Sequence, residues 1–304
     1  MDTSLLRQVT TIVTHENCPD GVASALILGA ALPDARVLFL QYGSAAHREL
    51  PAVPGMLFCD ITPPRERTHE FVRAGAMVLD HHKKQQDIVC AFGARGVFAD
   101  ERLDPGVSGA VLAFREALVP FNVAGGGRLA GAETLARLMG IRDTWQKHDP
   151  DFERASAISE ALRFVPFERL RAMELPAVLR LAHDLGPILL ERKLAAARDV
   201  AAQAVRIQAG ALRVAVIPST TLTSDAAELI EDADVVAGFA YRADPGGTGL
   251  RLQWSLRSRT GVDVSAIAAR HPGGGGHTAA AGFAVPDDGR SPYLRAPGLL
   301  RLEG

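Results

Sequence analysis

Four short apolar runs, each of a length typical of a β-strand, dominate the first half of the chain. They cover residues 9–14, 36–40, 56–59 and 76–79. Helical patterns separate or follow them, at residues 22–31, 64–74, 108–118 and 132–140. Strands that are apolar throughout and alternate with helices are typical of a parallel sheet covered on both faces. This half is therefore predicted to be an α/β domain with a doubly wound parallel sheet.

The second half begins with a different pattern. Between Pro187 and Ile207, apolar residues recur at helical spacing and charged residues fill the other face, which predicts one long helix after Gly186. Strands are expected at residues 212–217, 235–241 and 249–256, and a short helix at residues 264–269. Residues from Pro286 onward are rich in proline and glycine and are expected to form a loosely held tail. The expected organisation is a first domain over residues 1–185, a linker helix over residues 186–209 and a smaller α/β domain over residues 210–304.

Length, charge and composition limit the function classes. A chain of 304 residues suggests two domains at about 100–200 residues each. The 33 basic and 35 acidic residues argue against extensive binding to long duplex nucleic acid. Membrane contact is not expected, because no run approaches the roughly 18 apolar residues of a membrane span. The first residues lack a secretory signal pattern, so a cytoplasmic location is expected.

The cysteines point to no disulfide or zinc framework. Cys18, Cys59 and Cys90 are too few for a disulfide scaffold and lack the C-x-x-C spacing of a structural zinc site. Cys18 and Cys59 are expected to be small packing residues.

Histidine and aspartate residues follow three of the predicted strands directly. His15 and Asp20 come after the first strand, Asp60 ends the third, and Asp80-His81-His82 ends the fourth. In an open parallel sheet the ligand crevice lies outside the carboxyl ends of the strands. We therefore expect these side chains to meet at one rim of the sheet.

Such a cluster favours a metal site. Carboxylates close together repel one another unless a cation compensates. Carboxylate oxygens suit hard cations and imidazole favours transition metals, which indicates Mn²⁺, Mg²⁺ or a similar ion. Each residue alone has a simpler explanation, with Asp20 as a helix N-cap, Asp60 as a turn residue and the two histidines as surface imidazoles. Their joint placement at strand ends favours the metal site.

A glycine run near the C-terminus is a second candidate site. Residues 273–276 are all glycine and precede His277, and Arg257 and Ser258 lie upstream. Successive glycine N–H groups can converge on an anion, and a helix beginning after them would add a favourable dipole. A flexible loop is the alternative, but the nearby arginines favour a phosphate or nucleotide cradle.

These motifs together resemble a known family. Asp80-His81-His82 after an apolar strand resembles the signature of the DHH phosphoesterase superfamily. Residues 15–21 resemble its first motif, Asp60 its second, and Asp143 its fourth. Residues 255–283 resemble the accompanying DHHA1 domain. The layout is similar to that of the short RecJ-like, nanoRNase-type members.

The resemblance implies a phosphoesterase with two Mn²⁺ ions, or Mg²⁺ or Co²⁺, whose active site lies between a catalytic DHH domain and a substrate-binding DHHA1 domain. The metal ligands implied are His15 for the first ion, Asp20, His81 and Asp143 for the second, and Asp60 as the bridge. His82 would face the scissile phosphate as a charge stabiliser or proton donor, and Asp80 would orient the imidazoles. The substrate-binding residues implied are Arg257, Ser258, Gly274, Gly275, Gly276 and His277.

One position departs from the family pattern. Family members usually place another aspartate in the first motif, and its equivalent here is Asn17, unless Glu16 compensates. An amide oxygen can ligate a cation but brings no charge. The first ion is then expected to bind more weakly, or to be a different ion.

The expected function is hydrolysis of a phosphoester in a short RNA or DNA oligonucleotide, a dinucleotide or a nucleotide, by a water activated by two metal ions. A phosphoanhydride hydrolase resembling exopolyphosphatase or pyrophosphatase is the enzymatic alternative. A noncatalytic nucleotide sensor is the alternative that Asn17 raises. A homodimer is left open.

Overall fold

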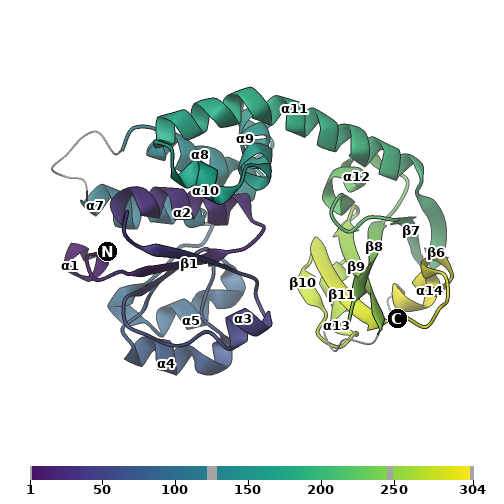
Figure 1. The fold of residues 1–304 in the computed structure, drawn as a ribbon. Coiled ribbons are helices and arrows are strands. Elements are labelled where there is room, and N and C mark those ends of the chain that lie inside the picture. Colours follow the sequence, from purple (N-terminus) through teal and green to yellow (C-terminus); the bar gives the residue numbers. More distant parts are fainter. Residues whose placement is uncertain (1, 122–128, 245–248, 302–304) are drawn as a thin grey trace. The chain divides into compact units, whose positions relative to one another are not determined.

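A computed structural model describes residues 2–121, 129–244 and 249–301 (Figure 1). The chain divides into two compact units, Met1–Leu190 and Glu191–Gly304. The boundary lies inside the long helix α11, and each unit has its own sheet and its own apolar cores. The units are therefore described one at a time.

The first unit contains a five-stranded parallel sheet in the order β2-β1-β3-β4-β5. The strands are β1 (Thr11–His15), β2 (Arg36–Leu40), β3 (Met56–Cys59), β4 (Met77–Asp80) and β5 (Gly96–Phe98). The four strands expected from the sequence are confirmed. The strand β5 was not predicted, because three residues are too few to show a periodic pattern.

Helices cover both faces of this sheet (Figure 1). The α-helices are α1 (Thr3–Leu6), α2 (Pro19–Ala31), α3 (Ala45–Arg48), α4 (Thr68–Arg73), α5 (Gln86–Cys90), α6 (Gly109–Leu112), α7 (Val119–Phe121), α8 (Ala132–Asp143), α9 (Phe152–Phe164) and α10 (Phe167–Arg171). A π-helical stretch, Ala113–Leu118, continues α6. Neighbouring residues of one strand enter different cores: Leu57 packs with α2, α6 and α8, and Phe58 packs with α4 and α5 on the other face. The predicted burial on both faces is confirmed for β3 and β4, whereas the edge strands β2 and β5 are partly exposed.

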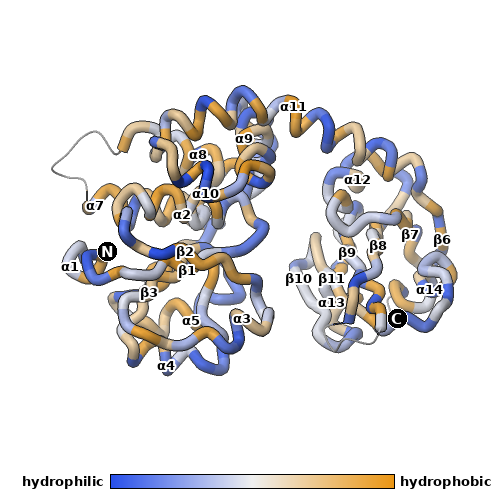
Figure 2. The backbone as a smooth tube through the Cα atoms, viewed as in Figure 1, coloured by the Kyte–Doolittle hydropathy of each residue, from blue (hydrophilic) through white to orange (hydrophobic). Residues whose placement is uncertain are grey.

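The helix α11 (Leu175–Ala202) differs from the prediction at both ends. It begins well before Pro187, which lies inside it, and it ends before residues 205–209, which form a strand. A proline inside a helix costs about 3 kcal/mol or more. Burial of Leu175, Val178 and Ala182 in the first core offsets that cost. Figure 2 shows hydrophilic and hydrophobic residues alternating along α11.

The second unit contains a six-stranded mixed sheet in the order β10-β11-β9-β8-β7-β6. The strands are β6 (Val205–Ala209), β7 (Leu212–Ile217), β8 (Val235–Ala243), β9 (Leu250–Ser258), β10 (Gly275–His277) and β11 (Ala280–Pro286). Its helices are α12 (Thr223–Leu229), α13 (Val264–Ala269) and α14 (Pro292–Leu299). The predicted strands β7, β8 and β9 and the helix α13 are confirmed. The sheet is antiparallel except between β7 and β8.

The prediction of a loose tail after Pro286 is wrong for the described residues. Pro292 lies in the first turn of α14, where a proline is tolerated. Ala296 and Leu300, spaced by one helical turn, are fully buried in the core of the second unit. The proline- and glycine-rich composition gave the wrong prediction, because the burial of Ala296 and Leu300 holds this segment against the core of the second unit. Among the described residues, no helix is both long and apolar enough to cross a membrane.

Candidate metal centre

The candidate ligands lie at one rim of the parallel sheet, as predicted. His15 is the last residue of β1, Asp60 follows β3, and Asp80 ends β4 with His81 and His82 directly after it. The three strands are neighbours and parallel, so their carboxyl ends share an edge. The rim is thus built by topology from segments that are far apart in the sequence.

One group of candidate ligands surrounds the imidazole of His81. Its Nε2 atom lies 3.3 Å from Oδ1 of Asp60 and 3.5 Å from Oδ2 of Asp143. Asp20, His81 and Asp143 each offer one ligand atom, and these three atoms lie within 4.8 Å of one another. Asp20 comes from the first turn of α2, and Asp143 is the last residue of α8. This spacing suits a single cation among oxygen and nitrogen donors.

A second group lies on the other side of Asp60. The Nδ1 atom of His15 lies 4.0 Å from Oδ2 of Asp60. Ligand atoms of His15, Cys18 and Asp60 lie within 4.8 Å of one another, and the same holds for Asp60, His81 and His82. Asp60 therefore directs Oδ1 toward His81 and Oδ2 toward His15, which is the geometry that a bridging carboxylate needs.

The carboxylates of Asp20 and Asp60 are buried and incompletely paired. Oδ1 of Asp20 accepts hydrogen bonds from Oγ of Ser108, at 2.7 Å, and from the N–H of Ala110, at 3.2 Å. The Oδ2 atoms of Asp20 and Asp60 are buried and have no hydrogen-bond partner among the described residues. Buried charged oxygens are costly unless they are paired or coordinate a metal. The residues present therefore fit a divalent cation.

Gly109 makes this close approach of two carboxylates sterically feasible. A Cβ atom at this position would lie 2.5 Å from Cβ of Asp60 and 2.8 Å from Oδ2 of Asp20. Gly109 is also the first residue of α6, whose N-cap Ser108 holds Asp20. The start of α6 thus positions both acids.

Electrostatics at the rim reflect this crowding. Burial, followed by the charges of Asp60 and Asp143, raises the pKa of Asp20 well above its usual value. Burial likewise raises the pKa of Asp143, and the charge of His81 opposes this shift. Burial alone would lower the pKa of His81, but the hydrogen bond to Asp60 and the charges of Asp143, Asp60 and Asp20 raise it to about 10. Without a cation, the site therefore retains protons to limit repulsion between its acids.

Asp80 orients His82. Oδ1 of Asp80 accepts hydrogen bonds from the backbone N–H of His82, at 2.8 Å, and from its Nδ1, at 2.7 Å. Burial would lower the pKa of His82, but the bond to Asp80 raises it to about 9. With Nδ1 engaged in this way, Nε2 is the nitrogen of His82 available to another group.

A hydrogen-bonded chain behind Asp80 was missed by the sequence reasoning. The hydroxyl of Tyr42 donates to Oδ2 of Asp80 at 3.2 Å and accepts from the N–H of Thr62 at 3.0 Å. The Nδ1 atom of His47 accepts from the N–H of Gly43, so its Nε2 donates to the carbonyl of Thr62 at 2.9 Å. The sequence could have indicated Tyr42, because this residue lies just after the strand at residues 36–40 and therefore at the same rim of the sheet.

Backbone strain is concentrated around the candidate ligands. Among the described residues, the non-glycine residues with positive φ are Asn17 at 58°, Asp60 at 63° and Trp145 at 57°. Such conformations are uncommon outside glycine and cluster at functional sites. Asn17 is exposed, and its backbone carbonyl accepts a hydrogen bond from Nη1 of Arg163 at 3.0 Å.

A cavity of about 240 Å³ opens beside the acids. Its lining residues are His15, Asn17, Cys18, Pro19, Asp20, Met139, Arg142, Asp143, Ser159 and Arg163. Arg142 and Arg163 are among these lining residues, and neither was predicted. The guanidinium carbon of Arg142 lies 4.3 Å from the ring centroid of Trp145. The cavity is therefore suited to an anion next to the metal centre.

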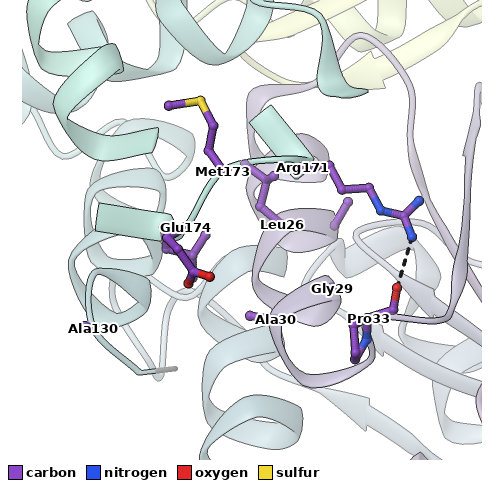
Figure 3. Close-up of a pocket in the computed structure, with 10 residues that line it drawn as sticks. Leu26, Gly29, Ala30, Pro33, Ala130, Arg171, Met173 and Glu174 are labelled. Atoms are coloured by element: carbon purple, nitrogen blue, oxygen red, sulfur yellow. Dashed lines mark hydrogen bonds between the residues drawn. The ribbon is translucent and has the colours of Figure 1, made fainter. Parts of the chain in front are cut away.

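A separate pocket of about 210 Å³ lies between α2 and the segment that leads into α11 (Figure 3). Leu26, Gly29 and Met173 line it, and Arg171 donates a hydrogen bond to the carbonyl of Pro33 at 3.2 Å. None of the predicted site residues lines it. It is therefore distinct from the candidate metal centre.

In the second unit, Arg257 and His277 share one face of the sheet. Arg257 on β9 is opposite Ala280 on β11, which is opposite His277 on β10. Residues directly opposite one another in antiparallel strands point to the same face. Nε of Arg257 also donates to Oγ of Ser224 at 2.9 Å, and burial lowers the pKa of Arg257. Oγ of the neighbouring Ser258 is buried without a hydrogen-bond partner among the described residues.

The glycine run does not precede a helix, so the expected contribution of a helix dipole is wrong. Gly275 and Gly276 belong to β10, and the N–H of Gly274 donates to the carbonyl of His271. A Cβ at Gly274 would lie 2.0 Å from the carbonyl oxygen of Ala268, so glycine lets this segment pack closely on α13. Tight packing explains Gly274 and Gly276, whereas a Cβ at Gly275 would meet nothing within 4 Å.

The sequence matches no protein-family model and no curated protein. Solved structures do match. A DHH domain from a protein described as belonging to a family of ribosomal proteins has a TM-score of 0.60 and 14% identity, covering 99% of this chain and 89% of that one. The exonuclease RecJ bound to manganese has a TM-score of 0.57 and 19% identity, covering 98% and 92%. An exopolyphosphatase-related protein from Bacteroides fragilis has a TM-score of 0.54 and 14% identity, covering 98% and 96%.

These similarities extend over nearly the whole chain at low identity, so they concern the fold. They confirm the predicted architecture, which is a parallel α/β unit followed by a smaller mixed α/β unit. The chain has the fold of RecJ and other DHH-domain proteins.

Proposed function

We propose that the chain is a member of the DHH/DHHA1 superfamily that hydrolyses phosphoesters with the help of divalent cations. One observation carries the proposal: Asp20, Asp60 and Asp143 converge on His81, and two buried carboxylate oxygens lack a hydrogen-bond partner among the described residues. Repulsion among three acids is a cost to folding that a cation would remove. Similarity in fold to RecJ, which was solved with manganese bound, supports the choice of ion.

The candidate ligands divide into two sets. Asp20, His81 and Asp143 would hold one ion, His15 would hold the other, and Asp60 would contact both. Asn17 remains a proposed additional ligand to the ion of His15. Two such ions, when bound, would lower the pKa of a water molecule and neutralise charge on a phosphoryl group. Mn²⁺ is proposed first, with Mg²⁺ and Co²⁺ as alternatives.

His82 is proposed to act on the substrate directly. Nδ1 of His82 is bonded to Asp80, and this bond raises the pKa of His82 to about 9 in the metal-free protein, so a protonated ring would direct an Nε2–H toward a phosphoryl or leaving-group oxygen. Asp80 fixes the ring through Nδ1, and Tyr42 fixes Asp80. Arg142 and Arg163 on the wall of the adjacent cavity would bind other phosphoryl oxygens.

The second unit is proposed to bind another anionic part of the substrate. Arg257 and His277 share a sheet face, with the small Ala280 between them. Ser258 follows Arg257 in β9, so its buried hydroxyl points to the opposite face, and the predicted substrate contact of Ser258 does not belong to this face. Gly274, Gly275 and Gly276 keep this edge of the sheet free of bulky side chains. Short oligonucleotides, dinucleotides or nucleotides are the proposed substrates, since the near-equal numbers of basic and acidic residues do not favour long duplexes.

A phosphoanhydride hydrolase is the second candidate function. The similarity in fold to an exopolyphosphatase-related protein favours it, because that match covers 98% of this chain. The same metal centre would serve either reaction. The choice therefore depends on what the second unit and the cavity recognise.

Chromatography of products from a substrate panel tests the proposal. Short RNA, short DNA, dinucleotides and polyphosphate would be incubated with Mn²⁺, Mg²⁺, Co²⁺ or a chelator. Mononucleotide release that depends on the cation is the expected result, whereas phosphate release from polyphosphate would favour the second candidate. Binding of nucleotides without turnover under every ion would contradict both and indicate a sensor.

A matched pair of variants links this activity to the centre. Asp143→Asn is expected to lower turnover at least about 100-fold, since removal of even an outer-shell partner of a metal costs 10–100-fold. Asp199→Asn, on an exposed position of α11, is the control and is expected to leave turnover unchanged. Equal activity of the two variants would contradict the assignment.

A further inference from the structure

Cys18 lies among the candidate ligands, although the sequence suggested only a packing role. Ligand atoms of His15, Cys18 and Asp60 lie within 4.8 Å of one another. Resting on the proposed metal-dependent function, we propose that Cys18 is a thiolate ligand and that the ion shared with His15 and Asp60 is Zn²⁺ or a similarly thiophilic ion. The two ions of the centre would then differ in kind.

The local backbone directs the sulfur toward the rim. After β1 ends at His15, the chain turns through Asn17, whose φ is 58°, and α2 starts at Pro19. Cys18 is thus the N-cap residue of a 13-residue helix, yet its side chain makes no capping hydrogen bond. Cys18 also lines the cavity beside the acids. In the metal-free protein, burial and the charges of Asp60 and Asp143 raise the pKa of the Cys18 thiol well above its usual value, so the thiolate would form only together with a bound cation.

Asp60 supplies an independent indication of a ligand at this place. Its side chain is 1% exposed, and Oδ2 has no hydrogen-bond partner among the described residues. The same oxygen lies 4.0 Å from Nδ1 of His15. A buried, unpaired carboxylate oxygen next to an imidazole, in a residue that also has a ligand atom within 4.8 Å of the Cys18 sulfur, fits a cation better than it fits simple packing.

The chemistry of the donors separates the two sets. Asp20, His81 and Asp143 offer two carboxylates and one imidazole, which suit Mn²⁺ or Mg²⁺ as well as other ions. His15, Cys18 and Asp60 offer nitrogen, sulfur and oxygen, and sulfur selects Zn²⁺ or Co²⁺ over Mg²⁺. Cys18 also provides the negative charge that Asn17 lacks. On binding, the sulfur–metal bond replaces the S–H bond, and the proton passes to solvent.

Absorption spectroscopy with Co²⁺ tests the proposal without any activity measurement. Titration of the metal-free protein is expected to produce the near-ultraviolet charge-transfer band of a cobalt–thiolate bond, saturating at one equivalent per chain. Cys18→Ser is expected to lose the band and still bind Co²⁺ through Asp20, His81 and Asp143. Cys90→Ser, at an exposed cysteine, is the control and should keep the band.

Further variants separate this proposal from the proposed function. Asp143→Asn is expected to keep the thiolate band while losing the other ion. Cys18→Asp is expected to shift the preference for Zn²⁺ over Mn²⁺ toward Mn²⁺ by at least tenfold, measured by competition between the ions. Two bound Co²⁺ ions without a thiolate band would overturn the proposed role of Cys18 and leave the proposed function intact. A band that survives in Cys18→Ser would have the same meaning. Failure of the unaltered protein to bind any divalent ion would overturn both proposals.

Discussion

The candidate residues of the two units differ in how much their surroundings perturb them. At the rim of the first unit, Asp20, Asp60, Asp80 and His81 are buried. The pKa values of Asp20, His81 and Asp143 are raised. On the sheet of the second unit, Arg257 is hydrogen-bonded to Ser224, and His277 is exposed on a short edge strand. The shifts at the rim come from several acids and imidazoles acting on one another, as is typical of sites of chemistry and cation binding. In the second unit, Arg257 is shifted by its own burial, and no such cluster surrounds it among the described residues. The two regions should therefore respond differently to mutation, pH and metal.

The largest expected difference concerns Asp60. Asp60→Asn should lower turnover by more than about 100-fold and weaken both cations, because one carboxylate faces both sets of ligands. Turnover assays and calorimetric metal titrations would measure these effects. Asp232→Asn, at an exposed aspartate of the second unit, is the matched control. If Asp60→Asn still binds two ions with unchanged affinity, Asp60 does not bridge them and the proposal is contradicted.

Cation affinity at the rim of the first unit should depend on pH. His81, with a pKa of about 10, must lose its proton to ligate an ion, so cation affinity should rise about tenfold per pH unit between pH 6 and 8. Raised pKa values of His81 and His82 stabilise the metal-free fold fully below pH 6.5, and this stability is lost as pH rises through 9–10. Calorimetry at several pH values would measure both trends. A flat affinity profile would contradict protonation of His81 in the metal-free protein.

Gly109 offers a steric test of the rim. Gly109→Ala should destabilise the protein by about 1–3 kcal/mol, because the new methyl group would overlap Asp60 and Asp20. Metal affinity should fall as well. The control is Gly29→Ala in α2, where a Cβ meets nothing within 4 Å and a gain of about 0.4–1 kcal/mol is expected. Chemical denaturation with and without Mn²⁺ would measure both, and equal effects would argue against crowding at Gly109.

The smallest expected effect lies in the second unit. Arg257→Ala should raise KM about tenfold with little change in kcat, because it removes binding that does not change between ground state and transition state. Metal affinity should stay the same. Arg206→Ala, at an arginine of β6 paired with Asp232, is the control. A fall in kcat without a change in KM would place Arg257 in the chemical step.

The rim was predictable because its signal is local. The strands β1, β3 and β4 are short and mainly apolar, and each ends on or directly before His or Asp. The carboxyl-end rule for parallel sheets therefore places His15, Asp60 and Asp80 together without any tertiary information. The ends of β2, β3, β7 and α13 agree with the apolar patterns for the same reason.

The remaining features depend on contacts between distant segments. Cys18 joins the ligands only because of the turn at Asn17, and Gly109 matters only because α6 starts beside Asp20 and Asp60. Pro187 is accommodated because α11 packs on the first core, a fact that no local signal carries. Composition likewise cannot show that Ala296 and Leu300 are buried.

The most direct test of the central idea is anomalous diffraction from a crystal soaked in Co²⁺, an ion suited to both sets of candidate ligands. The account predicts two anomalous peaks about 3.5–4 Å apart on either side of Asp60. One should lie beside His81 and Asp143, and the other beside His15. Well-ordered Asp60 and His81 with no peak within about 2.6 Å of either would contradict the account.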